Sequence, residues 1–212
     1  MKKINILIAD DHPIVREGLK QIISETDDMM VADEAGNGRE VLDLVRKKEY
    51  DLLLLDISMP GRSGLEILKE LKSEYPKLPV LILSIYPEEQ YAVRAFRAGA
   101  SGYLTKASAP NELISAIKKI VNGGRYVSES LAEKLTYYLD EDSSRPPHDL
   151  LTDREYQVML MLGSGKTVKE VAEELFLSVK TISTYRTHIL EKMKMKNNAE
   201  VTLYVIKNKL VD

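Results

Sequence analysis

The sequence predicts two domains, an α/β domain with a doubly wound five-stranded parallel sheet and a small all-α domain that follows it. Apolar runs alternate with amphipathic helical segments over residues 1–122, whereas every pattern after residue 150 is helical. A polar segment with a Pro-Pro step, residues 140–149, separates the two parts. A chain of 212 residues can bury one sizeable core and one smaller core.

Five strands are predicted where short apolar runs end at polar residues or turns. They are INILIAD (residues 4–10), MMVADEA (29–35), DLLLLD (51–56), PVLILS (79–84) and SGYLT (101–105). The four consecutive leucines of the third run indicate a strand buried on both faces, because a half-exposed strand would alternate. Helical segments such as PIVREGLKQIIS connect the strands, so right-handed βαβ crossovers are expected.

The domain boundaries follow from the breaks in these patterns. NGGR ends the last helix of the first domain, which we place at residues 1–125. A linker is expected at residues 126–149, with a short helix predicted from residue 128 and a polar stretch after it. The all-α domain, residues 150–212, has helical patterns at 152–162, 167–175, 179–193 and 198–210, and Thr152 with Glu155 fits a capping box.

The composition excludes several classes of protein. The chain has no cysteine, so disulfides and thiolate metal sites are impossible. The start, MKKINILIADD, does not fit a signal peptide, and no run approaches the roughly 20 apolar residues that a membrane span needs. We therefore expect a cytoplasmic protein without a membrane partner.

The charge is distributed unevenly along the chain. Residues 1–150 carry 20 Lys+Arg against 25 Asp+Glu, whereas residues 151–212 carry 10 against 8. Residues 178–198 contain five cations and one acidic residue. This asymmetry is typical of an acidic module joined to a polyanion-binding module, and a solvated helical face is the alternative explanation.

A group of polar side chains is expected at one edge of the predicted sheet. Ligands of open parallel sheets bind at the carboxyl ends of the strands, where the strand order reverses. The predicted strands end there at Asp10 and Asp11, at Asp56, at Ser84 and at Lys106. Three close carboxylates repel one another, and Mg²⁺ with a phosphoryl group would resolve that conflict.

The same residues suggest a reaction. No phosphate-binding glycine motif is present, so a nucleotide site is not expected, and Asp56 itself could carry a phosphoryl group. Lys106 would pair with phosphoryl oxygens, and the Ser84 hydroxyl could donate to one. A cap or turn role for each aspartate is the alternative.

The segments IADDHPIVREGL, LLLLDISMPGRSGLEIL and VLILSIYPEEQYAVRAFRAGASGYLTK resemble the receiver domain of bacterial two-component response regulators. The resemblance covers about residues 3–122 and implies a flavodoxin-like fold. It implies that Asp56 accepts phosphate from a sensor histidine kinase. It also implies that Asp10 and Asp11 hold Mg²⁺ together with Asp56 and the backbone carbonyl of Ser58.

The resemblance extends to a conformational switch. It implies that Ser84 is the switch hydroxyl, Tyr103 the switch aromatic and Lys106 the lysine that contacts the phosphoryl group. Ala107 follows that lysine where many receivers have proline. The resemblance implies no enzymatic activity beyond self-phosphoryl transfer and slow self-dephosphorylation.

The basic part of the all-α domain matches a DNA-binding motif. Helices at residues 167–175 and 179–193, joined by a short turn, form a predicted helix-turn-helix whose second helix enters the major groove. A helical bundle used only for protein contact is the alternative. Side chains on the polar face of the second helix and at its cap are the expected contacts to phosphates and base edges: Ser178, Lys180, Thr181, Ser183, Thr184, Thr187, His188 and Lys192.

The segment that begins LTDREYQVMLML and ends KMKMKNNAE resembles the LuxR-type DNA-binding domain. A receiver followed by this domain is the arrangement of the NarL/FixJ subfamily. The resemblance implies a transcriptional regulator in which phosphoryl transfer from a histidine kinase to Asp56 promotes homodimerisation and binding of double-stranded DNA.

Three other functions remain open at this point. Haloacid-dehalogenase-type phosphatases also use a strand-end aspartate, but Ser58 stands where their second aspartate belongs. If the receiver-like domain is never phosphorylated, the protein would be a phosphate-independent DNA-binding adaptor. An RNA-binding adaptor would need aromatic side chains on which bases stack, and no such platform is visible.

Overall fold

A computed structural model of the chain describes residues 3–128, 131 and 146–211. The chain divides into two compact units, Met1–Tyr137 and Tyr138–Asp212. Most of the helix predicted from residue 128, and most of the predicted linker, lie outside the described residues.

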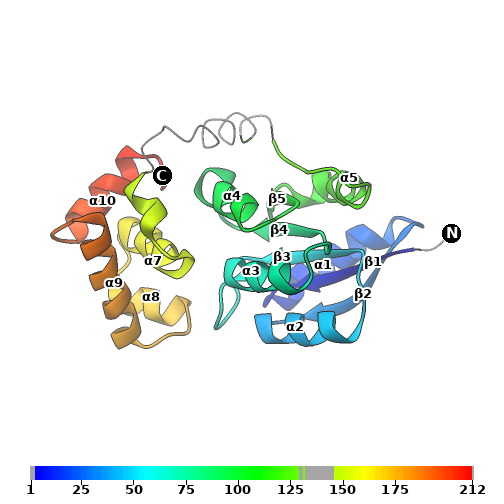
Figure 1. Ribbon diagram of the computed structural model, residues 1–212, viewed down its shortest axis with the longest axis horizontal. Helices are drawn as coiled ribbons and strands as arrows, with labels where there is room; N and C mark the ends of the chain where they lie inside the picture. Colours follow the sequence, from blue (N-terminus) through cyan, green and yellow to red (C-terminus); the bar gives the residue numbers. More distant parts are fainter. Residues whose placement is uncertain (1–2, 129–130, 132–145, 212) are drawn as a thin grey trace. The chain divides into compact units, whose positions relative to one another are not determined.

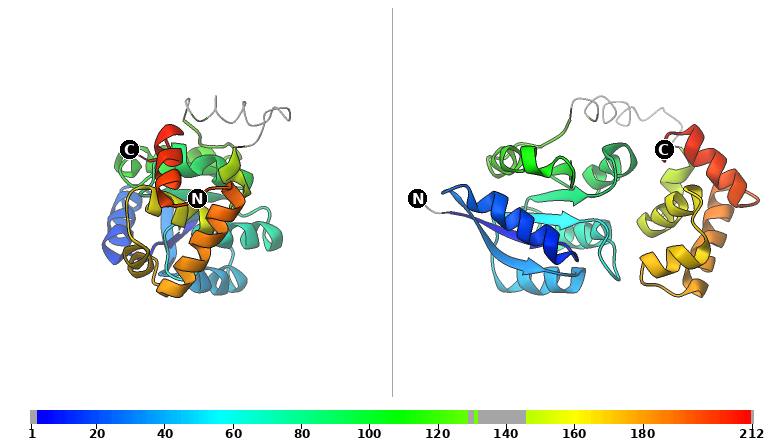
Figure 2. Two further views of the ribbon diagram at one scale, coloured as in Figure 1. Left: turned by 90° about the vertical axis from the view of Figure 1, so that its left-hand side faces the viewer. Right: turned by 180° about the vertical axis from the view of Figure 1, so that it is seen from behind.

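The first unit is a five-stranded parallel sheet with helices on both faces (Figures 1 and 2). The strand order is β2-β1-β3-β4-β5, so the predicted doubly wound sheet is confirmed. Its elements are β1 (Ile4–Ala9), α1 (Pro13–Ser24), β2 (Met29–Ala35), α2 (Gly38–Lys47), β3 (Leu52–Asp56), α3 (Gly64–Glu74), β4 (Val80–Ser84), α4 (Glu88–Arg97), β5 (Gly102–Thr105) and α5 (Ala109–Val121).

The core of this unit lies on both sides of the central strands. Every residue of β3 and β4 is buried, as the run of leucines predicted for β3. On one face, α1 and α5 pack with the strands in a single apolar cluster. The strand order reverses at β1 and β3, so the loops that follow these two strands meet at the same edge.

The loop after β3 folds back closely over the end of that strand. Ser63 caps α3 in a reciprocal capping box with Glu66, and the Gly64 amide donates to the Ile57 carbonyl at 2.9 Å. A Cβ atom on Gly64 would lie 2.0 Å from the backbone oxygen of Asp56. The absence of a side chain at Gly64 therefore permits this close approach of the loop to the backbone of Asp56.

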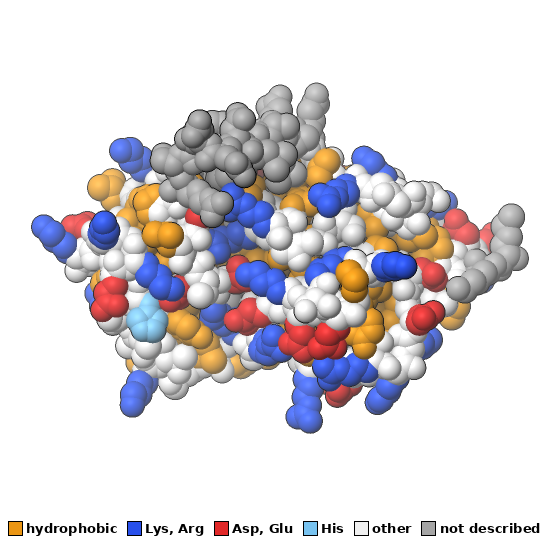
Figure 3. All heavy atoms as spheres, in the orientation of Figure 1, with side chains coloured by type: hydrophobic (Ala, Val, Ile, Leu, Met, Phe, Trp, Pro, Cys, Tyr) orange, Lys and Arg blue, Asp and Glu red, His pale blue; other side chains and the backbone are white. Residues whose placement is uncertain are grey.

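The second unit is helical and contains the four predicted helices together with a 3₁₀ turn that the sequence did not indicate. The elements are η1 (Pro147–Leu150), α7 (Asp153–Gly163), α8 (Val168–Glu174), α9 (Val179–Met193) and α10 (Asn198–Lys207). The predicted capping box of Thr152 and Glu155 is present at α7. Charged side chains of both signs are interspersed over the visible surface of the protein (Figure 3). Among the described residues, no helix is long and apolar enough to cross a membrane.

The close approach at Gly64 gives a testable prediction. Gly64→Ala should lower the free energy of unfolding of the first unit by at least about 2 kcal/mol, because the new methyl group collides with backbone rather than with a movable side chain. Gly18→Ala is the matched control, since Gly18 is exposed on α1 with nothing within 4 Å of the added carbon. That change should stabilise by about 0.5–1 kcal/mol. Urea unfolding measures both, and equal effects would contradict the packing argument.

Candidate functional site

Two carboxylates and one ammonium group meet at the carboxyl edge of the sheet. Asp10 follows β1, Asp56 ends β3 and Lys106 follows β5. Lys106 Nζ lies 2.6 Å from Asp10 Oδ2 and 2.9 Å from Asp56 Oδ2. Asp10 and Asp56 are each only 1% exposed, so both carboxylates depend on this lysine for much of their compensation.

The proximity of these charges shifts their proton affinities. Burial raises the pKa of Asp56, the Lys106 ammonium opposes that shift, and the neighbouring Asp10 carboxylate adds to it. Burial lowers the pKa of Lys106, but the Asp56 and Asp10 carboxylates outweigh burial and raise it overall. Lys106 therefore remains an ammonium group at neutral pH.

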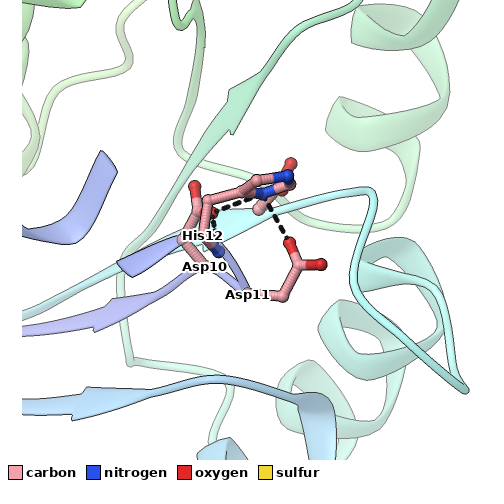
Figure 4. A group of neighbouring side chains, drawn as sticks. Asp10, Asp11 and His12 are labelled. Atoms are coloured by element: carbon pink, nitrogen blue, oxygen red, sulfur yellow. Dashed lines mark hydrogen bonds and ion pairs between the residues drawn. The ribbon is translucent and has the colours of Figure 1, made fainter. Parts of the chain in front are cut away.

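Asp11 and His12 complete a cluster of potential cation ligands. Asp10, Asp11, His12 and Asp56 each offer one ligand atom, and these atoms all lie within 4.8 Å of one another. The His12 ring turns toward both adjacent aspartates, with Nδ1 2.8 Å from Asp11 Oδ1 and 3.3 Å from Asp10 Oδ1 (Figure 4). Ser58 approaches the cluster through its backbone amide, which donates to Asp56 Oδ1 at 3.2 Å.

His12 is the member of this cluster that sequence reasoning missed. Its position directly after the Asp10–Asp11 pair was visible, but the direction of its ring was not. The structure thus brings together Asp10, Asp11, Asp56 and Lys106 as the sequence predicted, and adds an imidazole. Three carboxylates facing one ammonium leave negative charge uncompensated, which suits a divalent cation.

The predicted switch residues lie beside this cluster and are joined through Tyr86. Ser84 and Tyr103 are fully buried. The Tyr86 amide donates to Ser84 Oγ at 3.1 Å, and the Tyr103 hydroxyl donates to the Tyr86 carbonyl at 2.8 Å. The Lys106 amide donates to the Ser84 carbonyl at 2.7 Å. The loop after β4 is therefore hydrogen-bonded to the buried Tyr103, and Ser84 at the end of β4 is hydrogen-bonded to the backbone of Lys106.

The second unit presents a polar face on α9. Ser178 caps this helix by accepting from the Thr181 amide at 3.0 Å, and Thr181 itself is half-buried. Ser178 and the remaining six predicted DNA contacts are exposed. These six residues lie on α9: Lys180, Ser183, Thr184, Thr187, His188 and Lys192.

Three hydroxyl groups on this face are hydrogen-bonded to the helix itself. Ser183, Thr184 and Thr187 donate to the carbonyls four residues earlier at 2.9, 3.1 and 3.1 Å. This leaves their oxygen atoms available as acceptors, and the threonine methyl groups can make apolar contacts.

Lys192 is engaged within the second unit. Its Nζ lies 2.9 and 2.6 Å from the two carboxylate oxygens of Glu155, and His188 Nδ1 is 3.5 Å from the same carboxylate. Glu155 also accepts from the Thr152 amide at 2.8 Å in the capping box of α7. Burial opposes the charge of Glu155, but Lys192 and Thr152 outweigh it and lower the pKa of this carboxyl. The ion pair thus connects α9 to the start of α7.

Comparisons with known proteins match both units. The family "Response regulator receiver domain" matches residues 6–118, and "Bacterial regulatory proteins, luxR family" matches residues 149–205. The chain is 35% identical to response regulator GacA of Pseudomonas protegens, with 99% of this chain and 98% of that protein covered. It is 36% identical to oxygen regulatory protein NreC of Staphylococcus carnosus, with 99% and 100% covered.

A solved structure covers nearly the whole chain. It is RcsB from Salmonella enterica serovar Typhimurium bound to promoter P1flhDC in the presence of the phosphomimetic BeF3⁻. It is 25% identical, has a TM-score of 0.61, and covers 96% of this chain and 98% of that chain.

The pair of Glu155 and Lys192 predicts a pH-dependent contribution to stability. Lys192→Met should lower the local stability of α7 and α9 by about 1–3 kcal/mol, because it leaves a hydrogen-bonded carboxylate without its counter-ion. Lys180→Met, which removes an exposed cation from the same helix, should change it by less than about 0.5 kcal/mol. Native-state hydrogen exchange of the α7 and α9 amides provides the measurement.

The sign of the pH dependence follows from the lowered pKa of Glu155. Its contribution is fully present above the ordinary value of 4.5 and is lost as the pH falls through the lower folded value. The Lys192→Met protein should lose less stability over that range than the wild type. An identical decline in both proteins would show that this ion pair has no stabilising role.

Proposed function

The chain belongs to the two-component response regulators that join a receiver domain to a LuxR-type DNA-binding domain, and from this premise we propose the chemistry of its control. A sensor histidine kinase transfers a phosphoryl group to Asp56, and the phosphorylated protein dimerises and binds double-stranded DNA. The observation that carries this proposal is the position of Lys106 between Asp10 and Asp56. Self-phosphoryl transfer and slow self-dephosphorylation are the proposed limits of its own chemistry.

We assign the receiver to residues 1–125, the linker to 126–149 and the DNA-binding domain to 150–212. Contacts near both ends of the linker support its role as a connection between the units. The Tyr126 amide donates to the Ser101 carbonyl at 3.0 Å in the first unit. His148 Nδ1 lies 2.7 Å from the Tyr204 hydroxyl in the second.

In the proposed transfer, a carboxylate oxygen of Asp56 attacks phosphorus as the bond from phosphorus to the kinase histidine nitrogen breaks. The Lys106 ammonium then pairs with a phosphoryl oxygen, which keeps its charge compensated after Asp56 has reacted. Asp10, Asp11, Asp56 and the backbone carbonyl of Ser58 would hold Mg²⁺. The cation would neutralise charge on the transferring group.

The contacts of Tyr86 suggest how the reaction changes the surface of the receiver. We propose that the Ser84 hydroxyl moves toward the new phosphoryl group to donate to it, which displaces the oxygen that accepts from the Tyr86 amide. Tyr86 also accepts from Tyr103, which is already buried in this structure. We therefore propose that the loop after β4 is the part that moves and that the buried position of Tyr103 is stabilised.

Two surfaces of the second unit support DNA binding as a homodimer. The polar face of α9 would enter the major groove, with Ser183, Thr184 and Thr187 reading base edges. On α10, Leu203 is 67% and Ile206 is 54% exposed, which is apolar area that a second subunit could cover. The structure of RcsB bound to promoter DNA supports DNA binding by this chain.

The phosphoacceptor assignment predicts the behaviour of one conservative variant. Asp56→Asn should abolish incorporation of phosphate from a small acyl phosphate donor with Mg²⁺, because it removes the nucleophile with little change in volume. Asp43→Asn, at an exposed position on α2, is the control and should incorporate phosphate like the wild type. Intact-mass spectrometry measures the product. Wild-type incorporation by the Asp56→Asn protein would refute the assignment.

The roles proposed on α9 predict two different losses. Lys180→Ala should reduce the slope of log affinity against log salt by about one, with sequence preference unchanged, because a phosphate contact carries no sequence information. Thr184→Ala should relax preference at one operator position by about 1–3 kcal/mol. Binding of operator variants across a salt series separates these effects. If Lys180→Ala alters sequence preference and Thr184→Ala does not, the roles are reversed.

A further inference from the structure

His12 is held against the acidic cluster by its local backbone. Pro13 begins α1, and the residue before a proline favours extended backbone, as the φ of −92° and ψ of 107° of His12 show. The His12 amide donates to Asp10 Oδ1 at 2.9 Å, which ties the backbone to the first aspartate. The ring then lies over both Asp10 and Asp11, with the side chain 61% exposed (Figure 4).

The distances around the imidazole match the spacing of ligands on one cation. Neighbouring ligands of an octahedral ion with bonds of about 2.1 Å lie about 3.0 Å apart, and opposite ligands about 4.2 Å apart. His12 Nδ1 lies 2.8 Å from Asp11 Oδ1 and 3.3 Å from Asp10 Oδ1, and both contacts are ion-pair or hydrogen-bond contacts with the spacing of neighbouring ligands, so a cation between these atoms would take the place of a proton on Nδ1. The ligand atoms of the four-residue cluster all lie within 4.8 Å of one another, so only a small contraction would bring them to the distances of one coordination shell.

Lys106 and His12 contact different oxygen atoms of Asp10. Lys106 Nζ contacts Asp10 Oδ2, whereas His12 contacts Asp10 Oδ1. One carboxylate can therefore face the ammonium group on one side and the imidazole on the other. A cation beside Oδ1 would leave the ion pair with Lys106 in place.

We propose that His12 donates its Nδ1 nitrogen to the cation held by Asp10, Asp11 and Asp56, and so determines which metal the site prefers. This inference rests on the metal site of the proposed function. Carboxylate and water oxygens suit Mg²⁺ and Mn²⁺ alike, whereas an imidazole nitrogen is a ligand of first-row transition metals rather than of Mg²⁺, so an added imidazole should raise the affinity for Mn²⁺ more than that for Mg²⁺. The site should thus discriminate in favour of Mn²⁺ more strongly than three carboxylates would.

The test uses Mn²⁺ bound to the full chain. Electron spin-echo envelope modulation should detect a coordinated ¹⁴N nucleus in the wild type. Labelling with ¹⁵N-histidine should replace that signal with the signal of a ¹⁵N nucleus. His12→Gln should remove the signal and weaken Mn²⁺ about tenfold, while Mg²⁺ affinity, measured by displacement of Mn²⁺, changes less than about threefold. His188→Gln removes an exposed imidazole of the second unit and should retain the signal. Circular dichroism checks that both variants are folded.

The outcomes separate this inference from the metal site itself. Saturable Mn²⁺ binding without a nitrogen signal in the wild type would show that His12 only orients the carboxylates, and would overturn the inference. Equal losses of Mn²⁺ and Mg²⁺ affinity in His12→Gln would overturn it too, as would loss of the signal in His188→Gln. If the wild type binds neither cation saturably, the proposed metal site fails, and the inference fails with it.

Discussion

The mutual repulsion of carboxylates at the carboxyl edge of the sheet is the constraint on which the receiver depends. Asp10 and Asp56 are almost completely buried, and Lys106 is the ammonium group that contacts both. Moving ionised groups out of water costs several kcal/mol each, so the apolar strands that place them there must supply compensating stability. The site remains short of positive charge, and it is therefore suited to a divalent cation and to a reaction that transfers phosphoryl charge.

A series of hydrogen bonds runs from Asp56 through Lys106 and Ser84 to the loop after β4. The backbone of Asp56 lies too close to Gly64 to admit a side chain there, and the carboxylate oxygen Oδ2 of Asp56 contacts Lys106. Ser84 accepts a hydrogen bond from the Tyr86 amide, and the Tyr86 carbonyl accepts one from the Tyr103 hydroxyl. Because a ligand shifts a conformational equilibrium only by its different affinity for the two states, these few hydrogen bonds can set the energy gap.

The sequence predicted the sheet and the carboxylate cluster because both follow from local patterns: apolar runs give strands, and parallel strands end at one edge. It did not predict the ring direction of His12 or the pairing of Lys192, which depend on side-chain rotamers and on residues distant in sequence. The positive charge of Lys192 made it an expected phosphate contact, yet it pairs with Glu155 on another helix. The end of α10 at Lys207, earlier than the apolar pattern indicated, coincides with a left-handed turn at Lys209.

Ion pairs and hydrogen bonds within the second unit reduce the number of cations of residues 178–198 that can contact DNA. Lys192 is held by Glu155, and the Arg186 Nε donates to Asn198 Oδ1 at 2.6 Å at the start of α10. Two of the five cations in residues 178–198 thus make contacts within the fold, which leaves three to bind DNA phosphates. Because non-specific DNA affinity depends on the number of neutralised phosphates, one copy of the unit should bind weakly. Weak binding by a monomer is what allows dimerisation to act as the control, since two half-sites must then be contacted together.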